Sequence, residues 1–277
     1  MKKIIAITVL LSLFFSTIQA QGPWTKGKNK AYIQVGFSGI FYDKVRLNNE
    51  KTTLAANIAD ITSQLYTEYG ITDNLDVTLI LPYKTTTVKS KVGNNSESIS
   101  GLGNVTLGLK YKFFDKNWKV SAGLFYSANS GIANEQQGLR TGYGANTFLP
   151  YITAGTSQGK IYYFANIGYG YMTNDYTDFL KIGGEFGYKF LSKTHLILNL
   201  ELKSALSKEK YFDSVENSYF QGTTTYIDKQ QFFGVGIKLN HEFLANKFGA
   251  NIGAIGAISQ NNLPFAPSFN VGVYYKL

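Results

Sequence analysis

Alternation of apolar and polar side chains with a period of two constrains this chain more than any other feature. In NVTLGLKYKFFDKNWKVSAGLFY, residues 104–126, the odd positions from Val105 to Phe113 are apolar, and the even positions are polar or glycine. After the turn DKNW the apolar set resumes at Val120 and runs in steps of two to Tyr126. Successive side chains of a strand point to opposite faces, so this stretch predicts a hairpin with one wholly apolar face.

The same alternation recurs along the whole chain, and it predicts twelve strands in one domain. We place them at residues 30–42, 61–71, 75–83, 103–113, 118–128, 147–156, 160–172, 179–190, 195–205, 230–243, 248–259 and 267–277. Tight turns are expected at 72–74, 114–117, 157–160, 191–194 and 244–247, whereas the polar stretches 43–60, 84–102, 129–146 and 206–229 predict longer loops. Short turns at one end and longer loops at the other are typical of outer-membrane barrels, whose short turns are periplasmic.

One face of each predicted strand contains no Asp, Glu, Lys or Arg, and the opposite face mixes charges with glycine and amides. A soluble β-sandwich, the alternative fold, also places charges outward. Glycine weakens a solvated strand, however, and suits the crowded interior of a narrow barrel better. We therefore predict an all-β fold, a single antiparallel transmembrane β-barrel of about 12 strands of the bacterial outer-membrane type, with its apolar face toward lipid.

The N-terminus indicates export. Lys2 and Lys3 precede an apolar run from Ile4 to Ile18 and then Gln19-Ala20, which is typical of a secretory signal peptide. We expect residues 1–20 to be the signal peptide, cleaved near Ala20, and residues 21–277 to form the barrel. A membrane-anchor helix is the alternative, but the apolar run is shorter than the roughly 20 residues of a spanning helix. The chain has no Cys, which excludes disulfides and a lipid anchor on cysteine.

The charged side chains on the predicted inward face are the candidate site residues, as groups that line the lumen. They are Glu68, Asp76, Lys110, Lys112, Lys119, Lys181, Glu185, Glu201, Lys203, Lys238 and Glu242, with Lys189 and Lys276 on the same face. These are five acids and eight lysines, an excess of three positive charges that predicts a modest preference for anions if the lumen is open. The alternative is that they pair into a ladder that fills the barrel.

Three stretches carry a resemblance to a known family. YGITDNLDVTLILPY (69–83), GLGNVTLGLKYKF (101–113) and GLRTGYGANTFLPYITAG (138–155) are similar to the outer-membrane barrels called "MetA-pathway of phenol degradation" proteins, a transporter group. The resemblance implies transport and does not by itself imply a phenol substrate. The chain departs from the family at Asn104, where an acid is expected, at Ser130-Gly131, and at Leu277, where an aromatic residue is usual.

The residues that catalysis would need are sparse. Barrel hydrolases place a histidine-centred site near the outer rim, but the two histidines, His195 and His241, are predicted at the periplasmic end. Two His and no Cys argue against a transition-metal site, and the scattered glycines lack the strand-then-helix context of a phosphate loop. We expect no enzyme activity, cofactor or metal. An outer-membrane lipid hydrolase is the most distant alternative.

The leading functional prediction is an outer-membrane channel or transporter for small molecules, which by the resemblance include hydrophobic or aromatic compounds. The second is a non-conducting barrel with a plugged lumen, which would act structurally or through its surface loops. The expected partners are outer-membrane lipid and lipopolysaccharide of a Gram-negative envelope, a small-molecule solute, and the barrel-assembly machinery. That machinery would read the last strand, NVGVYYKL. Nucleic acid is not expected, because the lysines are spread rather than clustered.

Overall fold

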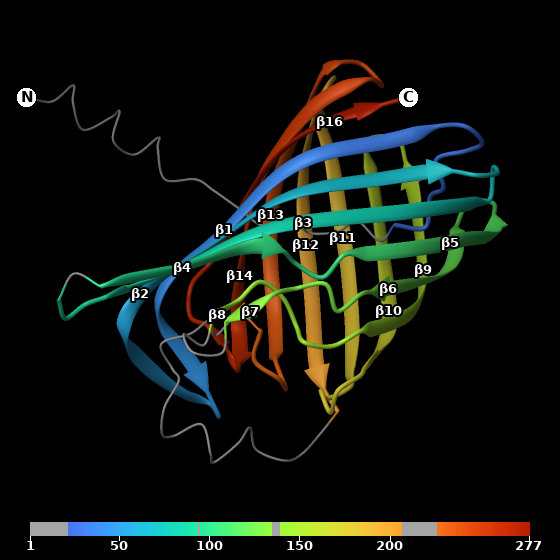
Figure 1. Cartoon of the computed structure of the whole chain (residues 1–277). Helices are drawn as coiled ribbons and strands as arrows, with labels where there is room; N and C mark the ends of the chain where they lie inside the picture. Colours follow the sequence, from blue (N-terminus) through green and yellow to red (C-terminus); the bar gives the residue numbers. More distant parts are fainter. Residues whose placement is uncertain (1–21, 94, 135–138, 207–225) are drawn as a thin grey trace, which may run out of the picture.

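The computed structural model describes residues 22–93, 95–134, 139–206 and 226–277, and it forms a closed antiparallel barrel (Figure 1). The predicted signal peptide lies outside the described residues. The barrel strands are β1 (Ala31–Leu47), β2 (Glu50–Gly70), β3 (Leu75–Ser90), β5 (Thr106–Asp115), β6 (Lys119–Ser127), β9 (Thr147–Gln158), β10 (Ile161–Met172), β11 (Phe179–Leu191), β12 (Thr194–Ala205), β13 (Gln231–Leu244), β14 (Phe248–Asn261) and β16 (Ser268–Lys276). The prediction of twelve strands is confirmed.

Each barrel strand pairs with its neighbour in the chain, and β1 closes the ring by pairing with both β2 and β16. The opening hairpin has the predicted register, because Leu107 lies opposite Tyr126 and Leu109 opposite Leu124 across β5 and β6. All five predicted tight turns are present, and they gather at one end of the barrel, called the short-turn end below. The other end, called the loop end, carries the remaining connections.

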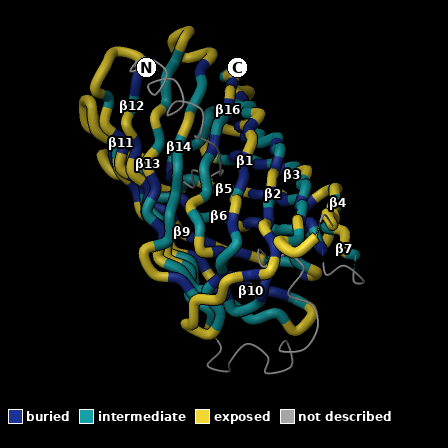
Figure 2. The backbone as a smooth tube through the Cα atoms, turned by 90° about the vertical axis from the view of Figure 1, so that its left-hand side faces the viewer, coloured by how far each residue is buried: buried dark blue, intermediate teal, exposed yellow. Residues whose placement is uncertain are grey.

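Buried and more exposed residues alternate along the strands, as the colour bands in Figure 2 show, which fits side chains that alternate between the two surfaces of the wall. Leu107 and Leu109 expose 50% and 52% of their surface, whereas Thr106 and Lys110, which flank them in the strand, expose 8% and 4%. Apolar groups therefore face outward and polar groups inward, as the sequence predicts. No helix among the described residues is long and apolar enough to cross a membrane.

The prediction of long loops at residues 43–60 and 84–102 is wrong, because strands continue through both stretches. β1 and β2 extend until only Asn48 and Asn49 connect them, both with positive φ (47° and 70°), as the central residues of a type I′ hairpin turn require. The stretch 84–102 likewise contains the end of β3 and all of β4 (Ser96–Leu102), which pair with each other. These strands run on past the rest of the barrel at the loop end (Figure 1).

The extended strands have a small core of their own. Val45, Leu54, Ile58, Val88 and Leu139 are buried together on one face of this sheet. Leu139 belongs to β8 (Leu139–Arg140), which pairs with β7 (Ala133–Asn134) inside the connection between β6 and β9. The short strand β15 (Leu263–Pro264) pairs with the far end of β1. Secondary structure thus covers part of the loop end.

Candidate functional site in the barrel lumen

Aromatic rings fill much of the barrel interior, and several of them lie over a glycine of the neighbouring strand. A Cβ atom on Gly108 would come within 2.5 Å of the ring of Phe125, its register partner across β5 and β6. A Cβ atom on Gly123 would meet the ring of Tyr151 at the same distance. The same arrangement joins Tyr162 with Gly187, Phe179 with Gly170, and Tyr274 with Gly249. The inward glycines therefore make room for rings.

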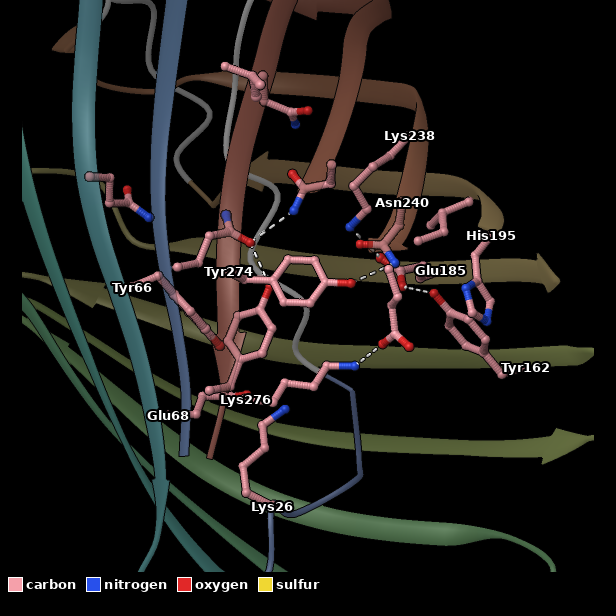
Figure 3. Close-up of a pocket in the computed structure, with 18 residues that line it drawn as sticks. Lys26, Tyr66, Glu68, Tyr162, Glu185, His195, Lys238, Asn240, Tyr274 and Lys276 are labelled. Atoms are coloured by element: carbon pink, nitrogen blue, oxygen red, sulfur yellow. Dashed lines mark hydrogen bonds and ion pairs between the residues drawn. The ribbon is translucent and has the colours of Figure 1, made fainter. Parts of the chain in front are cut away.

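The remaining space is divided into cavities that follow one another along the lumen. The loop-side cavity, about 470 Å³, lies between Ser38, Thr106, Leu149, Phe179 and Lys203 at the loop end. The turn-side cavity, about 290 Å³, is lined by the residues drawn in Figure 3. Gln64 lines both. A third cavity of about 350 Å³ shares Lys26, Glu68, Tyr162 and Glu185 with the turn-side cavity.

The turn-side cavity carries three lysines and three glutamates, and each lysine is paired. Lys26 Nζ lies 2.7 Å from Glu68 Oε2, and Lys238 Nζ lies 3.4 Å from Glu185 Oε2. Lys276 pairs with Glu242. Tyr162 and Asn199 also donate hydrogen bonds to Glu185, both at 2.6 Å. Buried charges need such partners. The cavity is therefore polar and electrically balanced.

Residues 22–30, called the N-terminal segment, reach into the short-turn end of the lumen. The Lys110 ammonium donates to the carbonyl oxygens of Trp24 (2.8 Å) and Gly22 (3.3 Å). The backbone N–H of Lys26 donates to Asp76 at 3.0 Å. The Trp24 ring meets Tyr162 edge-on, with centroids 5.8 Å apart. The segment is thus held by the lumen wall and narrows the passage there.

The candidate residues from the sequence take four different positions. Glu68, Glu185, Lys238 and Glu242 line the turn-side cavity, whereas Lys181, Glu201 and Lys203 line the loop-side cavity. Asp76 and Lys110 hold the N-terminal segment, and Lys110 also lines the third cavity. Lys112 and Lys119 both pair with Asp115 next to the 116–118 turn, outside these cavities.

Three charged residues of the described lumen were not predicted from the sequence. Lys26 precedes the first strand, so strand alternation gave no signal for it. Asp60 and Lys84 lie in stretches predicted as loops, although Asp60 continues the inward series of Thr62 and Gln64 and could have been found that way. Lys84 Nζ lies 3.1 Å from Asp60 Oδ1 in the loop-side cavity.

The barrel wall has a seam beside the loop-side cavity. β16 pairs with β14 only as far as Ser268 opposite Ile255, although β14 continues to Asn261. Within the part of the chain that the structure describes, residues 256–261 of β14 have no strand partner on that side. A side cavity of about 230 Å³ lies there, and it shares four lining residues with the loop-side cavity. Its walls are mostly apolar: Ile40, Ile255, Gly256, Ala257, Leu263, Pro264 and Ala266.

The two histidines lie near the short-turn end, as predicted. His195 lines the turn-side cavity, and His241 Nδ1 lies 2.8 Å from the Thr194 hydroxyl with its ring 5.0 Å from that of Phe243. The described residues contain no group of three or more His, Cys, Asp or Glu side chains that could hold a metal ion. No nucleophile hydrogen-bonds to either imidazole within those residues, apart from this threonine contact.

Sequence comparison identifies the family. A family model described as "Putative MetA-pathway of phenol degradation" matches residues 25–265. The chain belongs to this family. The resemblance of the three stretches between residues 69 and 155 is thereby confirmed, and the family match extends well beyond them. No curated protein matches the chain.

Solved structures similar to this family member are outer-membrane barrels. An outer membrane channel from Pseudomonas putida F1 has a TM-score of 0.70 at 14% identity, over 94% of this chain and 100% of that one. The KdgM porin has a TM-score of 0.50 at 9% identity, over 87% and 98% of the two chains. A mutant of the monoaromatic hydrocarbon channel TodX gives 0.50 at 10%, over 96% and 95%. At these identities the likeness establishes the fold.

Proposed function

We propose that the protein is a channel of the Gram-negative outer membrane through which small molecules pass without chemical change. The observation that carries this proposal is the series of adjoining cavities inside the barrel. The loop-side cavity meets the turn-side cavity at Gln64, and the turn-side cavity shares four residues with the third. Solved neighbours of the same fold are channels and porins, which supports the same function.

The two halves of this lumen suit different parts of a permeation path. The loop-side cavity is the larger and has aromatic and aliphatic walls, so it is the natural entry chamber for a solute from outside. The turn-side cavity is smaller and lined by ion pairs, so it forms the polar constriction on the way to the periplasm. An apolar solute would leave the entry chamber more easily through the seam beside β14, where the walls are apolar.

The location and partners follow from the same proposal. We propose that the outward apolar surface contacts outer-membrane lipid and lipopolysaccharide, and that the chain is exported with cleavage near Ala20 and assembled by the barrel-assembly machinery through β16. The histidine contacts offer no arrangement for hydrolysis, so we propose no enzyme activity. If the protein hydrolysed lipid and His195→Ala lost that activity, the result would support an outer-membrane lipid hydrolase instead.

A structural barrel with a plugged lumen is the competing function, and the N-terminal segment is the observation that favours it. The test is the conductance of the purified protein in planar bilayers. For a channel we expect discrete single-channel currents, and a larger conductance in the double variant Trp24→Ala, Lys26→Ala, which removes both side chains from the lumen. Lys28→Ala, whose side chain is exposed, is the control and should match the parent.

A plugged barrel would give no current in the parent or in Lys28→Ala, whether or not the double variant opened a path. Current in the parent that did not change in the double variant would show that the N-terminal segment does not restrict the path.

A further inference from the structure

The loop-side cavity has one wall made of rings and aliphatic side chains. Phe125, Leu149, Met172 and Phe179 belong to one buried apolar cluster, and all four also line the cavity. They come from four consecutive strands, β6, β9, β10 and β11, so the apolar wall is continuous across the sheet. Tyr143, from the connection between β6 and β9, packs against the same cluster. Such a wall suits the flat apolar face of an aromatic ligand.

Charge in this cavity is not balanced. The described residues that line it include three lysines and two carboxylates, and two of these lysines are paired. Lys84 pairs with Asp60 at 3.1 Å, and Lys181 Nζ lies 3.3 Å from Glu201 Oε1. Lys203 is the third. The cavity therefore carries one net positive charge, whereas the turn-side cavity carries none.

Lys203 is partly buried and has rings as its neighbours in place of an anion. Its ammonium lies 4.4 Å from the centroid of the Phe179 ring and 5.5 Å from that of Tyr143. Among the described residues no carboxylate oxygen lies within 4.0 Å of it. The nearby Asp228 carboxylate is engaged, because it accepts hydrogen bonds from the backbone and hydroxyl of Thr177. Ring contacts only partly replace the water that such an ammonium loses.

A second polar group in the same cavity lacks a partner within the described part of the chain. The hydroxyl of Tyr226, a lining residue, is buried and has no hydrogen-bond partner among the residues that the structure describes. A buried hydroxyl without a partner is destabilising, and an acceptor from a ligand would satisfy it. The cavity thus presents an ammonium and a hydroxyl, both suited to an anionic oxygen, beside an apolar wall.

We propose that the loop-side cavity is a binding site for the monoanion of a single-ring aromatic carboxylic acid. The ring would lie on the wall formed by Phe125, Leu149 and Met172, and the carboxylate would take the place beside Lys203. The inference rests on the proposed function only in that the ligand must enter the lumen from outside. A neutral aromatic would leave Lys203 unpaired, and a dianion would need a second free lysine. The volume of about 470 Å³ lies in the range of small-molecule sites.

The test is binding of benzoate to the purified full-length barrel in detergent, measured by titration calorimetry at low salt. Acetate, which lacks the ring, and benzyl alcohol, which lacks the charge, should each bind at least about tenfold more weakly, because each loses one of the two contacts. Lys203→Gln should weaken benzoate binding by about tenfold or more, and Tyr226→Phe by a smaller factor. Lys189→Gln, near the short-turn end, is the matched control and should bind as the parent does.

Heat-modifiable mobility on gels shows whether each variant is folded. Equal benzoate affinity in the parent and Lys203→Gln would overturn the assignment, as would acetate binding as tightly as benzoate or no benzoate binding by the folded parent. The proposed channel function fails separately. Benzoate binding without any bilayer conductance would support the binding site and contradict the channel function. Conductance without benzoate binding would support the channel function and contradict the binding site.

Discussion

At the scale of single residues, the packing of the barrel interior depends on pairs in which an aromatic ring lies over a glycine of the neighbouring strand. Rings stacked over glycines on adjacent strands restore the packing that glycine lacks and fix the register of those strands. The inward glycines were predicted as signs of a crowded lumen, which is the right location. Their partners were missed because a single strand does not show which residue of the next strand will lie opposite.

Gly108→Ala tests this packing. The new methyl group would overlap the Phe125 ring, at 2.5 Å, so we expect the free energy of unfolding to fall by about 1–3 kcal/mol. In a Phe125→Ala background the same change should cost much less, because the clashing ring is gone. The measurement is urea unfolding of the barrel in lipid vesicles. Gly256→Ala is the control, because a Cβ atom there has no neighbour within 4 Å. Equal costs in both backgrounds would contradict the ring-over-glycine account.

At the scale of strands, the sequence predicted the membrane part well and the parts beyond it poorly. In β5 and β6 the outward face meets lipid and the inward face meets polar groups, so the two faces differ at every step. In residues 50–57 of β2 the outward series is polar at Lys51, Thr53 and Asn57, because it meets water there, and only Leu54 and Ala56 of the opposite series are buried. The alternation fades while the backbone pairing with β1 continues. Strands outside the membrane were therefore predicted as loops.

The seam beside β14 is also a property of elements, since it depends on where pairing stops. At a rise of ~3.3 Å per residue and a tilt of ~40°, the paired stretch 248–255 climbs about 20 Å, so the seam begins within an apolar band about 25 Å tall. Gly256→Trp should obstruct the side cavity from its outward side, because Gly256 lines that cavity and a Cβ atom there has no neighbour within 4 Å. We expect slower uptake of labelled toluene by cells and unchanged bilayer conductance.

The control for the seam is Val92→Trp, in an exposed turn at the loop end, which should leave toluene uptake at the parent rate. If Gly256→Trp took up toluene as fast as the parent, the seam would not be a route for apolar solutes. If Gly256→Trp also lost ion conductance, the route of apolar solutes through the seam and the route of ions along the lumen would not be separate.

At the scale of the whole molecule, the distribution of charge along the lumen matters more than its sum. Counting inward residues strand by strand gave an excess of three positive charges. The folded chain adds Lys26, Lys84 and Asp60 and moves Lys112 and Lys119 to pairs with Asp115 near a turn. Lys110 is bound to backbone oxygens of the N-terminal segment. Because these relations join residues far apart in sequence, alternation within single strands could not predict them.

The ion preference of the channel should therefore depend on the turn-side cavity, where three lysines balance three glutamates. Lys238→Gln removes one lysine and leaves Glu185 in place, because Tyr162 and Asn199 still donate hydrogen bonds to it. The cavity then carries one net negative charge, which raises the local concentration of cations next to a low-dielectric wall. We expect the reversal potential across a potassium chloride gradient to shift toward that of a cation-preferring channel.

The shift should be largest at low salt and nearly absent near 1 M, where the screening length is only about 3 Å. Lys119→Gln, which removes the same charge beside Asp115 and outside the cavity, is the matched control and should keep the reversal potential of the parent. An equal shift in both variants would mean that the ions respond to the charge of the whole barrel. No shift in a conducting Lys238→Gln variant would mean that they bypass the turn-side cavity, in which case the permeation path would have to run through the seam.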